Sequence, residues 1–188
     1  MALTIIAGYK RGLKLKIPPP QLTRPTQSLI REAIFNVLGR DACPNARVLD
    51  LFAGSGAMGL EAISRGAQSA LFVENNKQVI KTLQENIALF PDKDLRILKA
   101  TLPQDFQKIL GLFDLIFMDP PYEMGLAPSE FLAYASAHSL VAPKANLVWE
   151  MDAIHLKSLN EIETSPFELF QEKNYGAKAC AFFRMPIS

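Results

Sequence analysis

Hydrophobic and polar residues follow two different rhythms along the first part of this chain. Between Leu3 and Ile17, apolar and basic positions alternate around Gly8 and Gly12, and this period of two predicts a short β-hairpin with one basic face. Three consecutive prolines, at 18–20, then form a stiff link. From Ser28 to Leu38 the apolar spacing becomes helical. The N-terminal part is therefore expected to be a hairpin followed by one helix.

After residue 47 the pattern changes to short apolar runs that alternate with helical periodicity. Such alternation predicts an α/β fold with a mostly parallel sheet covered by helices on both faces. The last two apolar runs flank a turn at Tyr175-Gly176 and predict an antiparallel hairpin added to that sheet. The expected strands are 48–53, 70–73, 96–98, 114–118, 146–149, 167–170 and 177–185, and the expected helices are 58–65, 77–90, 106–110 and 129–139.

The size of the chain suits one domain with a small extension. It has 188 residues, against about 150 for a typical domain. We expect residues 1–40 to form a basic hairpin-and-helix extension and residues 41–188 to form the main domain. With 49% hydrophobic and 21% charged residues, the composition excludes a wholly disordered or collagenous chain.

No segment of the sequence suggests a membrane, a secretion signal or a metal centre. Apolar runs fall short of the ~18 residues that a spanning helix needs, and the first ten residues lack the order of a signal peptide. Cys43 and Cys180 have no ligand-like spacing with each other or with His138 and His155. We therefore expect a soluble, cytoplasmic protein without a metal and without a disulfide scaffold.

The net charge of +1 hides an asymmetry between two parts of the chain. Residues 1–40 carry seven basic residues against the single acid Glu32, a net charge of +6, and the remainder carries −5. A basic arm on an acidic body favours a polyanionic partner, such as a nucleic acid, over an ordinary solvated surface. The basic residues are Lys10, Arg11, Lys14, Lys16, Arg24, Arg31 and Arg40.

A glycine-rich loop follows the first strand of the main domain. Residues 54–59 read Gly-Ser-Gly-Ala-Met-Gly and lie between a predicted strand and a predicted helix, as a nucleoside-binding loop requires. Glu74 ends the next strand, where a carboxylate can accept hydrogen bonds from ribose hydroxyls. Because the glycine loop, the helix after it and the acid at the end of the next strand all occur where such a site needs them, nucleoside-cofactor binding is favoured over a purely structural turn.

The charge of Asp50 bears on which cofactor this loop binds. Asp50 lies four residues before Gly54, near the carboxyl end of the strand, where it opposes the pyrophosphate of a dinucleotide and suits a cation. S-adenosylmethionine (SAM) offers an amino group and a sulfonium, and the helix N-terminus can take up its carboxylate. The alternative is a turn-forming aspartate that accepts hydrogen bonds from the loop's own N–H groups.

The sequence Asp119-Pro120-Pro121-Tyr122 follows the fourth strand directly, at the edge where open α/β sheets bind ligands. The exocyclic amine of a base is a poor nucleophile because its lone pair is delocalised into the ring. Asp119 and the carbonyl of Pro120 can each accept one N–H of such an amine, and the prolines orient these acceptors beforehand. Tyr122 can stack on the base. The motif therefore favours amine methylation over a simple Asp-Pro turn.

Together with the N-terminal segments, these motifs point to a family. Over nearly its whole length the chain resembles the bacterial RsmD-type methyltransferases, which use SAM to methylate guanine N2 in 16S ribosomal RNA. The Asp-Pro-Pro-Tyr motif also occurs in DNA adenine and cytosine N4 methyltransferases, so the N-terminal segments carry the distinction. The matching segments are 5–8, 24–26, 31–36, 49–56, 59–62, 64–67, 113–116, 119–122 and 175–176.

The resemblance implies a Rossmann-like class I SAM-dependent methyltransferase fold over residues 41–188. It also implies a partner, which is ribosomal RNA, the small ribosomal subunit or an assembly intermediate. The target guanine is expected to contact Asp119, Pro120 and Tyr122. The cofactor is expected to contact Asp50, Phe52, Ala53, Gly54, Ser55, Gly56, Glu74 and Thr101. The RNA is expected to contact Lys10, Arg11, Lys14, Lys16, Arg24, Thr26 and Arg31.

Three positions leave alternatives open. Family members usually carry an acid just after the third strand, whereas this chain has no acid between Lys99 and Asp105. Backbone groups or the Thr101 hydroxyl are therefore expected to recognise the adenine. Arg31 either contacts RNA or pairs with a helical carboxylate. Glu150 either faces the site or lies at the surface.

Three other functions fit this fold. A DNA amino-methyltransferase can use the same site, but 188 residues leave little room for a separate target-recognition domain. A catalytically idle RNA-binding protein has no need of the Asp-Pro-Pro-Tyr motif. A nicotinamide-dependent oxidoreductase binds a dinucleotide in its glycine loop instead of SAM.

Overall fold

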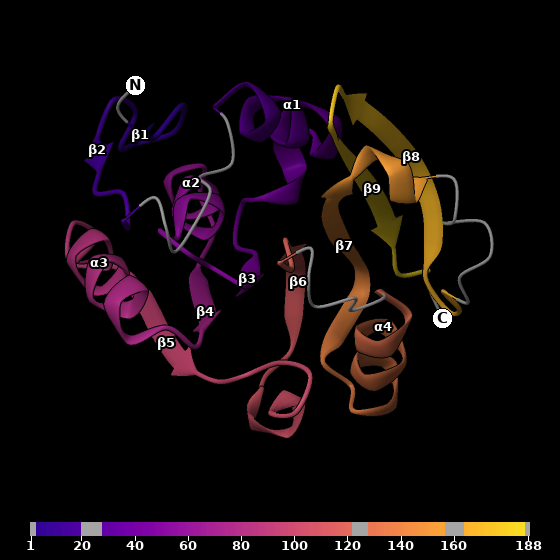
Figure 1. Ribbon diagram of the computed structural model, residues 1–188. Helices are drawn as coiled ribbons and strands as arrows, with labels where there is room; N and C mark the ends of the chain where they lie inside the picture. The colour runs from indigo at the N-terminus through magenta and orange to yellow at the C-terminus, as the bar shows by residue number, and fades with distance from the viewer. Residues whose placement is uncertain (1–2, 20–27, 122–127, 157–163, 187–188) are drawn as a thin grey trace.

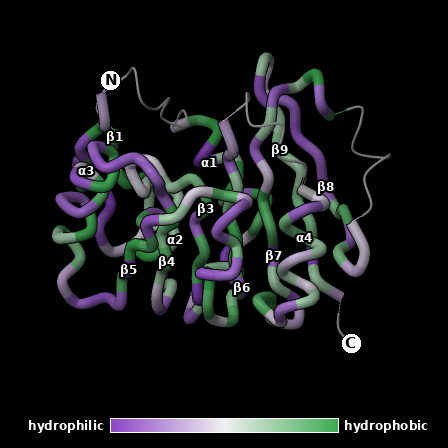
Figure 2. The backbone as a smooth tube through the Cα atoms, turned by 60° about the horizontal axis from the view of Figure 1, so that its bottom comes forward, coloured by the Kyte–Doolittle hydropathy of each residue, from purple (hydrophilic) through white to green (hydrophobic). Residues whose placement is uncertain are grey.

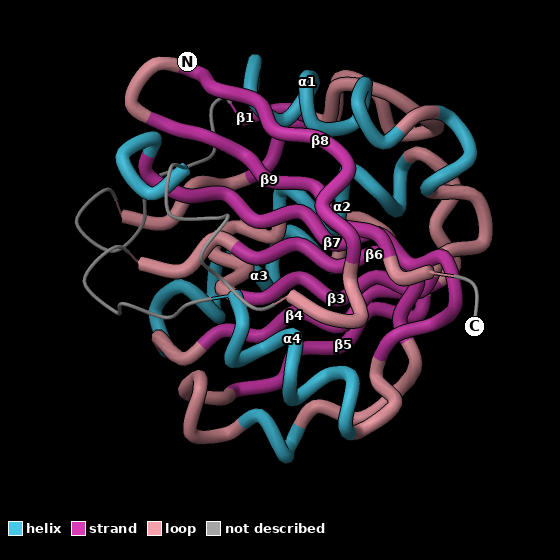
Figure 3. The backbone as a smooth tube through the Cα atoms, turned by 90° about the vertical axis from the view of Figure 1, so that its right-hand side faces the viewer, coloured by secondary structure: helices cyan, strands magenta, loops and turns pink. Residues whose placement is uncertain are grey.

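The computed structural model describes residues 3–19, 28–121, 128–156 and 164–186. Its main sheet has seven strands: β3 (Arg47–Leu51), β4 (Ser69–Glu74), β5 (Asp94–Lys99), β6 (Phe113–Met118), β7 (Val141–Asp152), β8 (Glu168–Tyr175) and β9 (Lys178–Arg184). They lie in the order β5-β4-β3-β6-β7-β9-β8, which can be followed from bottom to top in Figure 3. The strands from β5 to β7 are parallel, and β9 and β8 continue the sheet antiparallel. The predicted parallel sheet with a C-terminal antiparallel hairpin is confirmed.

Helices cover both faces of this sheet (Figure 1). On one face lie α1 (Ser28–Leu38), α2 (Ala57–Ser64) and α3 (Lys77–Ile87). The other face is covered by α4 (Pro128–Ala137) and the 3-10 turn η2 (Phe106–Lys108), and a second 3-10 turn, η1 (Arg40–Ala42), connects α1 to β3. No helix in the described ranges is long and apolar enough to cross a lipid bilayer.

The sheet separates two hydrophobic cores, because successive side chains of a strand point to opposite faces. In β3, Val48 packs with the core under α1, α2 and α3, whereas Leu49 and Leu51 pack with the core under α4. All three side chains are buried. A strand that is covered on both faces is therefore a continuous apolar run, and Figure 2 shows hydrophobic colouring along the inner strands. This is why the sequence locates these strands well.

Several elements differ from their predicted bounds; the strand expected at 167–170 is β8, which continues to Tyr175. Two of the differences have a local reason. The strand β7 begins at Val141 rather than at residue 146, because an irregularity interrupts the apolar pattern. Lys144 has a positive φ of 66°, and the register with β6 shifts between Phe113 and Leu115. The helix α3 ends at Ile87 rather than at residue 90, since the chain turns there instead of continuing the helix.

The N-terminal segment forms the predicted hairpin as a separate two-stranded sheet. Its strand β1 (Leu3–Thr4) pairs antiparallel with β2 (Lys14–Leu15), and Leu3 lies opposite Leu15. Leu3, Ile5 and Leu15 are buried in the same core as α1 and α2. The division of the chain at residue 40 stays a prediction, and the two parts share this core.

Candidate active site

Acidic side chains lie along the carboxyl edge of the parallel strands. We call them the acidic row: Asp50, Glu74, Asp119, Glu150 and Asp152. Leu51 on β3 is in register with Val73 on β4 and with Met118 on β6. Glu74 and Asp119 each come directly after these paired positions, so they lie at the same edge of the sheet. Open α/β sheets bind their ligands at this edge. The strands therefore bring the predicted cofactor and acceptor residues together.

Asp50 is held beneath this edge by the first turn of α2. Its Oδ2 accepts a hydrogen bond of 2.9 Å from the backbone N–H of Gly59, and the residue is only 4% exposed. A Cβ on Gly59 would lie 3.1 Å from Asp50 Oδ2 and 2.5 Å from the ring of Phe72, so glycine permits the approach. Burial raises the pKa of Asp50 to about 8, and the negative charges of Asp119 and Glu74 add to the rise, whereas the Gly59 hydrogen bond opposes it.

The glycine loop is fixed to the neighbouring strand. Ala53 N–H donates to the carbonyl of Val73, and Gly54 N–H donates to Glu74 Oε2 at 3.1 Å. Phe52 has a φ of 61°, which is unusual for a bulky residue and marks a strained backbone directly before the glycines. The side chain of Asn86 on α3 donates to the Ser55 carbonyl at 2.9 Å.

Glu74 is occupied by backbone donors. Besides Gly54, its carboxylate accepts hydrogen bonds from the N–H groups of Asn75 and Asn76, at 2.9 and 3.0 Å. A carboxylate offers about four lone-pair sites, so three backbone donors leave room for one further hydroxyl. The predicted cofactor residues from Phe52 to Gly56 thus lie in one loop, which Gly54 joins to Glu74 at the end of β4. Their contact with a cofactor stays a prediction.

Thr101 lies at the end of β5, beside the same loop, because Ala100 N–H donates to the Glu74 carbonyl. The next acid along the chain, Asp105, turns back to this segment. Thr101 N–H donates to Asp105 Oδ2 at 2.8 Å, and Asp105 Oδ1 lies 2.9 Å from Lys108 Nζ. The pKa of Asp105 is lowered, first by its hydrogen bond to Lys108. The backbone N–H of Thr101 therefore already has a hydrogen-bond partner, Asp105. The sequence had suggested backbone groups, or the Thr101 hydroxyl, for recognition of the adenine.

Asp119 and Pro120 follow β6 at the centre of the acidic row, and both are partly buried. Burial raises the pKa of Asp119 to about 6; the positive charge of Lys178 opposes the rise, and Asp152 adds to it. Tyr122, the third residue expected to contact the base, lies outside the described residues.

The sequence did not identify Lys178, although it lies next to Asp119. Its Nζ is 3.1 Å from Glu150 Oε1 and 4.0 Å from Asp119 Oδ1. Glu150 is only 6% exposed, so a surface role is wrong, and its ion pair with Lys178 places it next to Asp119. No local signal could reveal this contact, because it depends on the pairing of β9 with β7, where Lys178 is opposite Asp152.

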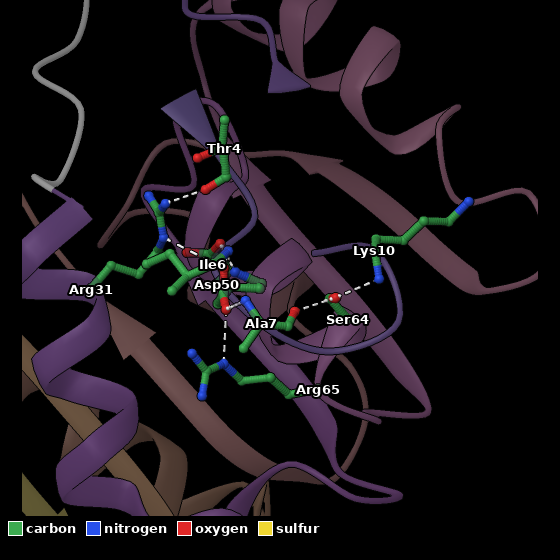
Figure 4. Close-up of polar contacts among 10 residues, drawn as sticks. Thr4, Ile6, Ala7, Lys10, Arg31, Asp50, Ser64 and Arg65 are labelled. Atoms are coloured by element: carbon green, nitrogen blue, oxygen red, sulfur yellow. Dashed lines mark hydrogen bonds and ion pairs between the residues drawn. The ribbon is translucent and has the colours of Figure 1, made fainter. Parts of the chain in front are cut away.

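Arg31 corrects one of the RNA predictions. Its side chain is fully buried, and its Nε lies 3.7 Å from Glu61 Oε2 on α2. Glu61 also accepts N–H donors from Ile6 and Ala7 and pairs with Arg65 at 2.8 Å (Figure 4). A buried guanidinium has no surface to offer RNA, so the prediction of an RNA contact is wrong. The alternative, pairing with a helical carboxylate, is confirmed.

The remaining basic residues of the hairpin lie at the surface to different degrees. Arg11, Lys14 and Lys16 are exposed, and Lys10 is partly buried. Lys16 pairs with Glu85 on α3 at 2.8 Å. The hairpin is therefore a basic surface fixed on α2 and α3, and its contact with RNA stays a prediction. Arg24 and Thr26 lie outside the described residues.

In the described parts of the chain, no three His, Cys, Asp or Glu side chains come together as a metal site. Cys43 and Cys180 are both free and buried.

Known proteins resemble this chain in sequence and in structure. Ribosomal RNA small subunit methyltransferase D of Escherichia coli is 36% identical over 124 residues, which cover 66% of this chain and 62% of that protein. The match thus spans less than two thirds of that relative. The protein of the same name from Haemophilus influenzae is 30% identical over 92% of this chain and 88% of its own length.

The solved structure of the yhhF protein of Escherichia coli covers 100% of both chains, with a TM-score of 0.85 and 29% identity. The family model described as conserved hypothetical protein 95 matches residues 3–184. This match and the relatives confirm the resemblance that the motifs indicated and the class I methyltransferase fold that it implied. The chain belongs to the conserved hypothetical protein 95 family, which is the RsmD-type methyltransferase family.

Proposed function

We propose that this protein transfers a methyl group from SAM to the exocyclic N2 amine of a guanine in small-subunit ribosomal RNA. The observation that carries the proposal is the position of Asp119 and Pro120. They follow β6 at the carboxyl edge of the sheet, beside Asp50 and the glycine loop. Relatives named as ribosomal RNA small subunit methyltransferases support the choice of substrate.

The residues of the cofactor loop fit SAM better than a dinucleotide. Asp50, Glu74 and Asp119 place three carboxyl groups at one edge, and the charges of Asp119 and Glu74 add to the rise that burial causes in the pKa of Asp50. A cationic ligand relieves such repulsion, whereas a pyrophosphate increases it. Asp50 and Glu74 would hold the amino group and the ribose. When bound, SAM supplies an electrophilic methyl group.

Asp119 and Pro120 prepare the acceptor amine for this transfer. One N–H of the amine donates to the Asp119 carboxylate and the other to the Pro120 carbonyl, which turns the nitrogen lone pair out of conjugation. The lone pair forms the new N–C bond as the C–S bond breaks, and that bond's electrons stay on sulfur. The nitrogen then loses a proton to water or to Asp119. This chemistry needs alignment and oriented acceptors.

The hairpin supplies a basic surface for the RNA backbone. Arg11 and Lys14 are exposed on it, and the hairpin is anchored to α2, the helix that begins at the glycine loop. Phosphate contacts add affinity without reading sequence. We propose that the hairpin holds the RNA while the carboxyl edge holds the target guanine.

Methyl transfer to purified small-subunit RNA, followed by mass mapping of the nucleosides, tests the proposal. We expect N2-methylguanosine as the product. Asp119→Ala should slow single-turnover transfer by roughly 10²–10³, the cost of one preorganised hydrogen-bond partner, while SAM affinity measured by calorimetry stays nearly unchanged. Asp94→Ala is the matched control, because Asp94 is an exposed acid that pairs with Arg96 at the amino end of β5.

Three results would contradict the proposal. Methylated adenine or cytosine in DNA would identify an amino-methyltransferase of another class. A protein that binds NAD and not SAM would be an oxidoreductase. Normal turnover by Asp119→Ala would remove the acceptor role from Asp119.

A further inference from the structure

Lys178 brings a positive charge into the acidic row from outside the parallel strands. It begins β9, and its side chain is 24% exposed, with Nζ 3.1 Å from Glu150 Oε1 and 4.0 Å from Asp119 Oδ1. The shorter distance shows that Glu150 holds the ammonium. Glu150 is nearly inaccessible, so the ion pair is shielded from water and is stronger than an exposed pair.

The strand pairing explains how the ammonium reaches this point. On β9, Lys178 is opposite Asp152 of β7, and Cys180 is opposite Glu150. Paired residues, and residues two apart on one strand, share a face of the sheet. Lys178 and Glu150 therefore project to the same face, and Glu150 lies beside the end of β6, where Asp119 follows.

Without Lys178, the charged groups that face Asp119 from the neighbouring strands would all be carboxylates. Asp50 faces it from β3, and Glu150 and Asp152 face it from β7, whereas Lys178 faces it from β9. The thiol of Cys180 is also near, and burial, followed by the charges of Glu150 and Asp119, raises its pKa, so it stays neutral. Lys178 thus opposes the burial and the carboxylate repulsion that favour a protonated Asp119.

We propose that Lys178 is a positioning residue for methyl transfer: its ammonium, held by Glu150, keeps Asp119 ionised and orients its carboxylate toward the amine of the substrate. The inference rests on the proposed function. A protonated Asp119 would donate a hydrogen bond from one oxygen and would be a weaker acceptor for an N–H group. A lysine of the C-terminal hairpin therefore acts on the ionisation of Asp119, the residue that follows β6.

The first test is the pH dependence of single-turnover methyl transfer. Removal of an opposite charge at this distance raises the pKa of a carboxyl by about 1–3 units. The acidic limb of the Lys178→Met profile should therefore lie at least one pH unit above that of the wild-type protein. Lys178→Arg, which keeps the positive charge, should leave the acidic limb close to that of the wild-type protein. Lys173→Met, an exposed lysine on β8, should leave the profile in place.

The second test does not need activity. With ¹³C-labelled aspartate, the carboxyl resonance of Asp119, assigned through its loss in Asp119→Asn, should titrate at higher pH in Lys178→Met than in the wild-type protein. Thermal melts of the three lysine variants confirm that the proteins compared are folded. If Lys178→Met does not fold, Lys178→Gln replaces it in both measurements.

The outcomes separate this inference from the proposed function. An unchanged titration of Asp119 in the folded variant overturns the inference, whatever the activity. If Lys178 contacts RNA phosphate instead, Lys178→Met should raise the KM for RNA and flatten the salt dependence of RNA binding, while the acidic limb of the pH profile stays in place. That result also overturns the inference. A wild-type protein that methylates no guanine contradicts the proposed function, while the resonance shift still reports on the pair.

Discussion

The carboxylate of Asp50 is linked to the backbone N–H of Gly59 by a hydrogen bond of 2.9 Å, across nine residues that include the whole glycine loop. The bond ties the end of β3 to the first turn of α2. It also places a carboxyl group in a buried position next to other acids, where its ionisation is unfavourable. The protein keeps this arrangement although a neutral side chain would be easier to bury.

Asp50→Asn should therefore stabilise the cofactor-free protein at alkaline pH. The pKa of Asp50 is about 8 in the fold and about 3.9 in an unfolded chain. The folded state then holds the proton more tightly, so this group's contribution to stability falls as pH rises from about 4 to about 8. Melting temperatures at pH 5 and pH 8.5 should show that the advantage of Asn grows with pH. A constant difference between variant and wild type would contradict this assignment. Calorimetry should show weaker SAM binding by the variant, because Asn carries no charge for the amino group.

Gly8→Ala should loosen the hairpin far more than Gly12→Ala. Both glycines have a φ of 83°, so a side chain strains the backbone equally at either position. A Cβ at Gly8 would lie 1.7 Å from the Ser64 carbonyl oxygen, whereas nothing lies within 4 Å of one at Gly12. Hydrogen exchange of the hairpin amides should speed up far more in Gly8→Ala. Equal exchange in the two variants would show that the contact with Ser64 contributes little.

Removal of Glu61 should destabilise the protein more than removal of Arg31. Glu61→Met leaves Arg31 buried without its carboxylate and leaves the N–H groups of Ile6 and Ala7 unpaired. An uncompensated buried charge costs about 3–5 kcal/mol. In Arg31→Met, Glu61 keeps Arg65 and both backbone donors, and the change removes two buried nitrogens without hydrogen-bond partners. Urea denaturation of both variants measures the difference, and a larger loss for Arg31→Met would reverse this interpretation.

The basic hairpin should account for most of the salt dependence of RNA binding. Each phosphate contact contributes about 0.7–0.9 to the slope of log K against log salt concentration. Replacing the four hairpin residues by Gln should flatten that slope by roughly three units if all contact phosphate. The control replaces Lys108, Lys144 and Lys173, which lie on other elements. A slope that changes as much in the control would show that the hairpin charges are merely solvated. The four residues are Lys10, Arg11, Lys14 and Lys16.

The elements of this fold could be predicted from the sequence because each depends on local periodicity. Strands such as β3 are buried on both faces and appear as apolar runs, and the glycine loop lies between a strand and a helix. The burial of Arg31 could not be predicted in the same way. It depends on Glu61, which looks like a surface position of a helix until the hairpin covers it. The contact between Lys178 and Asp119 depends on two strands that meet only in the folded sheet.

The anchoring of the hairpin also sets an order of events during synthesis. The backbone of residues 6–16 bonds to side chains of Glu61, Ser64 and Asn86, which lie 54–70 residues further along the chain. The hairpin emerges from the ribosome before these partners exist, so it cannot dock until α3 has been made. Contacts of such long sequence separation form slowly. During that interval the apolar side chains of Leu3, Ile5 and Leu15 lack the core in which the folded protein buries them.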